Sequence, residues 1–469
     1  MKLLINGQWL GEELEQINVI NPANQKIIDS VPSGTEQEAE AAVDAAYEAF
    51  HSWSLKTAEE RSQHLMKWFE LIEENEEDLA ITLTLEQGKP LAESRGEIRY
   101  ANSFIRWYAE EGKRVYGETI PASSPNKKIL VQKQPVGVVS VITPWNFPAA
   151  MITRKVAPAL AVGCTVVIKP APQTPLTALK LAELAEKANI PKGVINVVTG
   201  SAQVISGVWQ KDARVRKLTF TGSTQVGKLL MKEAAETMKK VSFELGGHAP
   251  FIVTKHANLD VACEQLMVSK FRNAGQTCVC ANRVYVEESV AVSFIEKVHM
   301  AMEKLKVGNG LDEGVTIGPL IDEAAVEKVL DQIQDARDKG ANVLVGGERL
   351  SGLFVQPTLL TDVSDEMICM NEETFGPVLP IATFKTEDEV IRRANDTPYG
   401  LAAYLFSDQL GQAIRLSEKL DYGIIGVNDG AISTAQAPFG GMKQSGIGRE
   451  GGHYGIDEFV EVKYISLQY

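Results

Sequence analysis

The chain has 469 residues, of which 44% are hydrophobic, and its 61 acidic against 47 basic side chains give a formal net charge of -14. A chain of this length can bury a large core without disulfides or metal ions, and a prior of about 150 residues per domain predicts two or three domains. The net charge argues against a nucleic-acid partner and against an anionic membrane surface, because both attract basic proteins.

Two long helices are expected to open the chain. Thr35 and Glu38 form a capping-box pattern before an alanine-rich run that ends at Phe50. Apolar residues then recur at helical spacing between about Glu59 and Gln87. The first seven residues turn polar too early for a signal peptide, and no apolar stretch approaches the roughly 20 residues that span a bilayer.

From residue 138 the pattern changes to short β-branched runs separated by helical patterns. Such alternation predicts parallel βαβ units, whose buried strands are continuously apolar. The expected strands are Val138–Thr143, Thr165–Lys169, Val194–Thr199 and Lys217–Thr221, and a second α/β region follows from about Ala249 to Val427. Apolar and charged residues alternate within 457–469, which predicts a terminal strand; without an obvious local partner, it can pair with another subunit.

The cysteines are odd in number, so they do not indicate a disulfide framework, and a reducing cytoplasm is the expected compartment. Cys278 stands out because it follows the polar loop Gly275-Gln276-Thr277 and precedes an expected strand, and loops held by a scaffold often carry catalysis. The alternative is a small buried apolar residue, which is the interpretation for Cys164 and Cys263. We expect no metal site.

Three other segments place polar groups at strand ends, where open α/β sheets bind ligands. Glu244 ends an apolar run before a glycine pair, and Asn146 follows the strand that begins at Val138. Gly222 and Ser223 open a helix whose free backbone amides can meet a phosphate. Each has a plain alternative: a solvated carboxylate, a turn asparagine and a simple strand-to-helix turn.

Together and in this order, the four segments resemble the aldehyde dehydrogenase superfamily, and the resemblance covers essentially the whole chain. Further matching segments are Val166-Val167-Ile168-Lys169-Pro170, Asn371-Glu372-Glu373-Thr374-Phe375-Gly376-Pro377 and Pro438-Phe439-Gly440-Gly441-Met442-Lys443. We therefore expect an α/β protein with a Rossmann-like cofactor domain, an α/β catalytic domain and a small β extension for oligomerisation into a homodimer or homotetramer. The expected boundaries are 1–117 with 137–247, then 248–435, and finally 118–136 with 436–469.

The resemblance also implies roles for individual residues. Cys278 is similar to the family's nucleophile, Glu244 to its general base, and Asn146 to its oxyanion-hole donor. The residues expected to bind NAD or NADP are Trp145, Lys169, Gly222, Ser223, Leu245, Glu373 and Phe375. A thiolate adds to the aldehyde carbonyl, hydride leaves to the cofactor, and water hydrolyses the resulting thioester. No histidine lies in these motifs, so a Cys–His protease arrangement is unsupported.

A narrower resemblance, to the succinate-semialdehyde dehydrogenase branch, concerns the substrate. It rests on the segments Pro144–Lys155 and Lys270–Asn273 and on the pair of Cys278 with Cys280. In that branch two arginines and a serine hold the distal carboxylate, and they correspond here to Arg154, Arg272 and Ser433. Guanidinium groups bind carboxylates through two parallel hydrogen bonds. The alternative is that Arg154 caps a helix and Arg272 lies on the surface.

The sequence departs from the family at two positions. His248 replaces an asparagine that often follows the glycine pair, and Pro172 replaces a glutamate common in NAD-preferring relatives. Without that carboxylate, Lys169 is free to accept a 2′-phosphate, so the cofactor preference stays open between NAD and NADP. Cys280 is a candidate resolving thiol for an oxidised Cys278, although residues two apart on an extended strand cannot reach disulfide geometry, and Cys280 can equally be a packing residue.

We therefore expect a cytoplasmic enzyme that oxidises succinate semialdehyde to succinate with NAD or NADP. Glutarate semialdehyde or another small aldehyde is the first alternative, because one methylene discriminates by only about 1–3 kcal/mol. A cysteine thioesterase or esterase without redox chemistry is the second, and the cofactor motifs argue against it. A non-enzymatic structural protein is the third, which the intact Cys278, Glu244 and Asn146 argue against.

Overall fold

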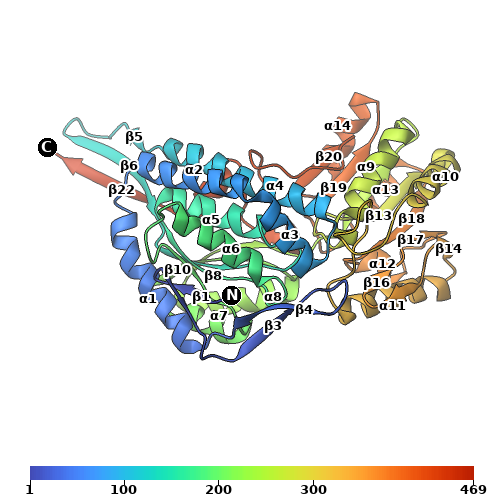
Figure 1. The fold of residues 1–469 in the computed structure, drawn as a ribbon. Helices are drawn as coiled ribbons and strands as arrows, with labels where there is room; N and C mark the ends of the chain where they lie inside the picture. Colours follow the sequence, from blue (N-terminus) through green and yellow to red (C-terminus); the bar gives the residue numbers. More distant parts are fainter.

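The computed structural model describes residues 1–469, and helices do not open the chain as the sequence predicted (Figure 1). Four short strands come first: β1 (Leu3–Ile5), β2 (Gln8–Leu10), β3 (Gln16–Ile20) and β4 (Ile27–Pro32). The predicted capping box then begins α1 (Glu36–Trp53), because the Glu38 carboxylate accepts a hydrogen bond from Thr35 N at 2.8 Å. Short half-exposed strands carry little apolar periodicity, so the pattern of α1 dominated the prediction.

The helix predicted from residue 59 to residue 87 is divided in two. Asn75 leaves helical geometry and its side-chain amide donates to Leu71 O at 2.7 Å, which separates α2 (Ala58–Glu74) from α3 (Glu76–Gln87). A further helix that the prediction missed, α4 (Leu91–Glu111), follows directly. It packs along α5 (Ala150–Val162) and on α2 and α3.

The first large sheet has the strand order β2-β1-β9-β8-β7-β10-β11-β21. Its central strands are parallel, as predicted, and they are β7 (Val138–Ile142), β8 (Thr165–Lys169), β9 (Ile195–Val197), β10 (Val215–Thr221) and β11 (Lys240–Glu244). One core cluster packs α2 to α5 and α6 (Pro175–Lys187) on one face of the sheet. A second cluster packs α1, α7 (Ala202–Lys211) and α8 (Thr224–Ala234) on the other face (Figure 1).

The second large sheet has the order β14-β17-β18-β13-β12-β19-β20 and its own core. Its strands are β12 (Ala249–Val253), β13 (Ala281–Glu287), β14 (Asn342–Val345), β17 (Thr358–Thr361), β18 (Val378–Phe384), β19 (Ala402–Phe406) and β20 (Ile424–Val427). The main helices of this region are α9 (Leu259–Phe271), α10 (Ala291–Met302), α11 (Glu323–Asp338), α13 (Glu387–Asn395) and α14 (Leu410–Lys419). These elements span the predicted second α/β region, so the α/β fold with a Rossmann-like half is confirmed.

A three-stranded sheet, β22-β6-β5, projects from the body at the C-terminus (Figure 1). The predicted terminal strand is β22 (Val460–Gln468), and it has a partner within the chain, the antiparallel strand β6 (Lys127–Pro135), which also pairs with β5 (Glu118–Ile120). The terminal strand thus pairs with the other segment that was expected in the β extension, 118–136, and not with a neighbour close in sequence. Not all of 436–469 lies in this extension, because β21 (Gly446–Ile447) pairs with β11. None of the helices has the length and apolar character needed to cross a membrane.

Candidate active site

Cys278 lies where two cavities meet between the large sheets. One cavity, of about 290 Å³, is lined by Cys278 together with the three predicted carboxylate ligands Arg154, Arg272 and Ser433. The other, of about 240 Å³, is lined by Cys278, Asn146 and most of the predicted cofactor residues, which are Trp145, Gly222, Ser223, Leu245, Glu373 and Phe375. The candidate nucleophile therefore faces both sites that the sequence predicted.

The loop that carries Cys278 begins with a left-handed turn. Asn273, Ala274 and Gly275 have φ angles of 53°, 54° and 77°, a conformation that costs roughly 1–2 kcal/mol for each residue other than glycine. A side chain at Gly275 has no room, because its Cβ would lie 2.2 Å from Gly376 O. The side chain of Gln276 holds the loop in place. It donates to Asn273 O at 3.0 Å within the loop and accepts from Ile321 N at 2.9 Å in the segment before α11.

Burial controls the Cys278 thiol and the Glu244 carboxyl. Loss of hydration raises the pKa of Cys278 to about 12, although Arg154 acts to lower it. At the end of β11, burial and then the charge of Glu450 raise the pKa of Glu244 well above its usual value. One Glu244 oxygen has no hydrogen-bond partner, and a Cβ at Gly440 would lie 2.9 Å from the other. Glu244 is thus a desolvated carboxyl next to backbone that only glycine can supply.

Asn146 occupies the turn between β7 and α5, beside the Cys278 loop. Its side-chain amide donates to Gln276 O at 3.1 Å, and its side-chain oxygen has no partner. The backbone N–H of Cys278 donates to no carbonyl in the structure. An amide N–H of Asn146 and the backbone N–H of Cys278 are therefore available for an anion near the sulfur.

The residues of the 240 Å³ cavity suit a nicotinamide dinucleotide. Ser223 caps α8, with its hydroxyl accepting from Val226 N at 3.3 Å, so this helix presents its amino-terminal amides to the cavity as phosphates require. The Glu373 carboxylate, a suitable partner for ribose hydroxyls, accepts from Gly247 N at 2.9 Å, and burial raises its pKa to about 7. The Phe375 ring packs edge-on against Trp145, with centroids 5.7 Å apart.

Lys169 lies outside the lining of that cavity, at the end of β8 opposite Ile142. It is buried without an ion pair, and burial lowers its pKa to about 8. Pro172, three residues on, is exposed and offers no carboxylate. This edge of the sheet thus holds a cation with no anionic partner in the protein.

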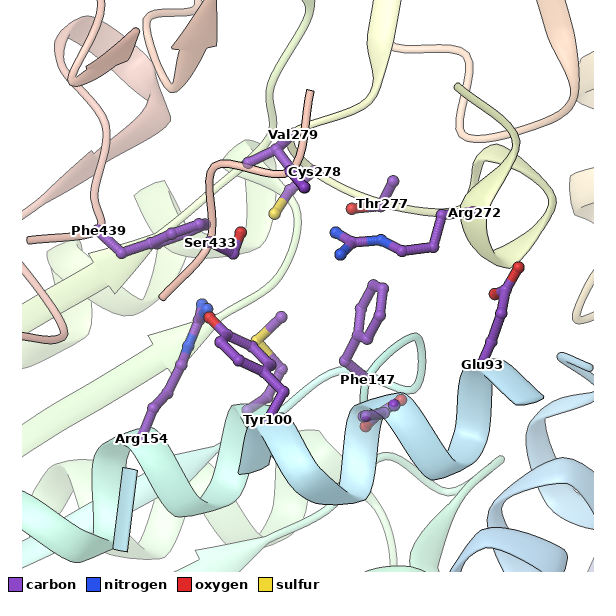
Figure 2. A pocket seen from close by; sticks show the side chains of 14 residues that line it. Glu93, Tyr100, Phe147, Arg154, Arg272, Thr277, Cys278, Val279, Ser433 and Phe439 are labelled. Atoms are coloured by element: carbon purple, nitrogen blue, oxygen red, sulfur yellow. The ribbon is translucent and has the colours of Figure 1, made fainter. Parts of the chain in front are cut away.

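The two predicted substrate arginines have different surroundings. Arg154 Nε contacts the buried carboxylate of Glu450, which Lys155 also contacts, while Arg154 Nη2 has no hydrogen-bond partner. Arg272 forms no ion pair, and its guanidinium lies over the Phe147 ring at 5.1 Å. Both guanidinium groups and the Ser433 hydroxyl point into the cavity beneath Cys278 (Figure 2). Arg272 is therefore the cation of this cavity without an ion pair, although its charge acts to lower the pKa of the nearby Glu93 carboxyl.

Sequence reasoning missed several residues of the two cavities. Glu450 holds Arg154 in place, yet its segment gave no periodic signal. Tyr100 lines the 290 Å³ cavity with its buried hydroxyl unpartnered and directed toward Arg154 (Figure 2), and Lys328 lines the second cavity. The acidic pair Glu93 and Glu97 also lines the cavity, and their four-residue spacing was a signal that could have placed them on one helix face.

Cys280 is fully buried, beside Lys270 Nζ at 3.4 Å, and both it and Cys278 are free thiols. Burial raises the pKa of Cys280 although Lys270 opposes that shift. These surroundings fit the packing alternative, and a resolving role for Cys280 stays a prediction.

Comparison with known proteins matches residues 9–465 to the aldehyde dehydrogenase family. A succinate-semialdehyde dehydrogenase [NADP(+)] from Escherichia coli is 56% identical over 99% of this chain and 97% of its own length, and a glutarate-semialdehyde dehydrogenase from Pseudomonas putida is 54% identical with the same coverage. The crystal structure of an E. coli NADP-dependent enzyme superposes with a TM-score of 0.99 at 55% identity, over 100% of this chain and 98% of the other. The chain therefore belongs to the aldehyde dehydrogenase family and is an NAD(P)-dependent aldehyde dehydrogenase of the succinate-semialdehyde dehydrogenase branch.

Proposed function

We propose that the protein oxidises succinate semialdehyde to succinate through a covalent thioester on Cys278. The observation that carries the proposal is the guanidinium of Arg272, which forms no ion pair and shares the cavity beneath Cys278 with Arg154 and Ser433. A small aldehyde with a distal carboxylate complements that charge, because guanidinium groups bind carboxylates through paired hydrogen bonds. The name of the E. coli relative supports the same substrate.

The proposed reaction begins with loss of the Cys278 thiol proton to water, and the charge of Arg154, which acts to lower the pKa of the thiol, stabilises the thiolate. The sulfur then forms a bond to the aldehyde carbon, and the carbonyl oxygen becomes an oxyanion. Asn146 and the backbone N–H of Cys278 donate to that oxyanion, and such a donor contributes roughly 3–4 kcal/mol in other enzymes. The nicotinamide cofactor supplies the hydride acceptor.

Hydrolysis completes the cycle. Glu244 takes a proton from water, the resulting hydroxide bonds to the thioester carbon, and the carbon–sulfur bond breaks with the electron pair returning to Cys278. A thioesterase or esterase without redox chemistry would need only this half of the site. The second cavity, which meets Cys278 and suits a dinucleotide, disfavours that alternative.

Replacing the base should separate the two halves of this cycle. In Glu244→Gln the amide cannot take a proton from water, so an acyl group should accumulate on Cys278 and steady-state turnover should fall by about 100-fold or more. Intact-mass measurement after mixing with succinate semialdehyde and NADP reports the adduct. Cys278→Ala, which cannot form it, is the control. Normal turnover in Cys278→Ala would refute the nucleophile, and normal turnover without an adduct in Glu244→Gln would refute the base.

Removing one arginine should change substrate preference. Arg272→Gln should lower kcat/KM for succinate semialdehyde about 30-fold or more, which corresponds to about 2 kcal/mol. The kcat/KM for butanal, which lacks the carboxylate, should change little. Arg154→Gln should change the ratio of kcat/KM between the two aldehydes less, because Glu450 already pairs with the Arg154 charge. Equal losses for both aldehydes in Arg272→Gln would remove the basis for a carboxylate substrate. A higher kcat/KM for glutarate semialdehyde than for succinate semialdehyde would instead reassign the substrate to the longer homologue, as the P. putida relative is named.

We also propose that Lys169 binds the 2′-phosphate of NADP. A lysine with a pKa near 8 is charged below that pH and loses its charge above it. The ratio of kcat/KM for NADP to kcat/KM for NAD should therefore fall about tenfold between about pH 7 and pH 9. Lys169→Met should give a low ratio that does not vary with pH, and Pro172→Glu should lower it at every pH. A constant ratio in the wild type would exclude Lys169 as the phosphate ligand.

We propose in addition that a second copy of the chain pairs with the projecting sheet. β22 is an edge strand, and Val462, Tyr464 and Tyr469 are 68%, 60% and 79% exposed on it or beyond its end. Unpaired strand edges recruit further strands. Light scattering should give a dimer or tetramer for the wild type, and a smaller species for the double variant Val462→Glu/Tyr464→Glu, which keeps the strand. A wild-type monomer, or an unchanged mass in the variant, would rule this edge out.

The cysteines, all free, support the cytoplasm as the compartment.

A further inference from the structure

Three charged side chains just before α4 and in its first two turns have no role in the proposed reaction. Lys89, Glu93 and Glu97 follow one another at four-residue intervals, and we call them the α4 charge row. The Lys89 and Glu97 side chains are 0% and 1% exposed, and Lys89 Nζ lies 2.5 Å from the Glu97 carboxylate. Glu93 lines the substrate cavity, and burial raises its pKa to about 7.

Each member of the α4 charge row binds backbone of an active-site segment, and Lys89 and Glu97 share the turn between β7 and α5. Lys89 Nζ donates to Asn146 O at 2.7 Å. The Glu97 carboxylate accepts from the backbone of α5 just beyond that turn, from Ala149 N at 3.0 Å and Ala150 N at 3.4 Å.

Glu93 binds the other side of the site. Its carboxylate accepts from Asn273 N at 2.7 Å, within the left-handed turn that leads to Cys278. The Asn273 side chain in turn donates to Asn146 O at 3.0 Å. The row thus connects the segment of the proposed oxyanion donor with the segment of the proposed nucleophile.

Stability alone does not account for a buried ion pair of this kind. Removing two charges from water costs several kcal/mol per ion, and replacing a buried pair by apolar residues is often neutral or stabilising. Lys89 and Glu97 instead fix the carbonyl of Asn146 and the amides of Ala149 and Ala150, so the turn between β7 and α5 is held at both ends. Between these points, Lys89 Nζ lies over the Phe147 ring at 3.9 Å.

We propose that Lys89, Glu93 and Glu97 are positioning residues that set the Asn146 amide relative to Cys278. The proposal rests on the proposed function, because it assigns the oxyanion to Asn146. An oxyanion donor acts only within about 2.7–3.1 Å of the developing charge. A displacement of about 1 Å from the reacting atoms can cost about 100-fold in rate. Asn146 sits outside any helix or strand, so its position depends on these side chains.

A double-mutant cycle between Lys89 and Asn146 tests the proposal. Lys89→Met keeps the length of the side chain and removes its charge and its bond to Asn146 O. It should lower kcat about 30-fold or more, by the same factor for succinate semialdehyde and for butanal, since both form the oxyanion. In an Asn146→Ala background the same change should cost less than about threefold, because the donor it positions is gone.

Lys217→Met is the matched control. Lys217 is also a fully buried lysine paired with a glutamate, Glu458, but it lies at the far end of β10 away from both cavities. The two methionine variants should lower Tm to a comparable extent, while Lys217→Met should keep wild-type kcat. That comparison separates lost stability from lost positioning.

The possible results are distinct. Equal losses from Lys89→Met in the wild-type and Asn146→Ala backgrounds would mean that Lys89 acts independently of Asn146, and the inference would fail while the proposed function stands. A loss of kcat in Lys217→Met as large as in Lys89→Met would reduce the effect to stability and also overturn the inference. Full activity of Asn146→Ala by itself would overturn the proposed oxyanion donor.

Discussion

The removal of charge from water around Cys278 is the constraint on which the rest of the site depends. Burial raises the pKa of the thiol to about 12 and raises the pKa of Glu244 as well, so neither group ionises readily by itself. A desolvated carboxylate is a strong base, and a desolvated oxyanion is stabilised strongly by fixed donors. The burial that hinders the formation of the thiolate thus favours the steps that follow it.

The protein meets this constraint by pairing most buried charges and leaving a few free. The Glu450 carboxylate forms ion pairs with both Arg154 and Lys155, and these cations lower its pKa despite the opposing effect of burial. Arg272 and Lys169 have no carboxylate partner, and each lies where the proposed reaction brings an anion. Lys169 is buried and Arg272 is half-buried, so an unpaired charge at either site is costly in the free protein, and an anionic ligand relieves that cost. Selectivity for anionic ligands then follows from these two cations, which the fold leaves without a carboxylate partner.

The sequence predicted the elements that are continuous in pattern. The limits of β8 match the predicted strand, because every residue of Thr165–Lys169 is apolar or buried in a parallel sheet. The division at Asn75 was missed, because the apolar spacing continues across it and only the local bond of its side chain ends the helix. Glu97 and Glu450 could not be identified as buried, since a carboxylate in sequence is ordinarily a surface group and only the tertiary fold supplies its cation.

The same two glutamates, Glu93 and Glu97, hold both the segments that carry the substrate-binding arginines and the segments that carry the reacting groups. Arg154 lies one turn into α5, whose first amides are bound by Glu97, and Arg272 directly precedes Asn273, whose amide is bound by Glu93. The left-handed turn at Asn273 stores strain that the neighbouring hydrogen bonds must hold. A carboxylate bound by both arginines would therefore act on the same two segments that carry Asn146 and Cys278. Binding of the distal carboxylate can therefore help to position Asn146 and Cys278 at the reacting carbon. Binding energy used in this way raises kcat rather than only lowering KM.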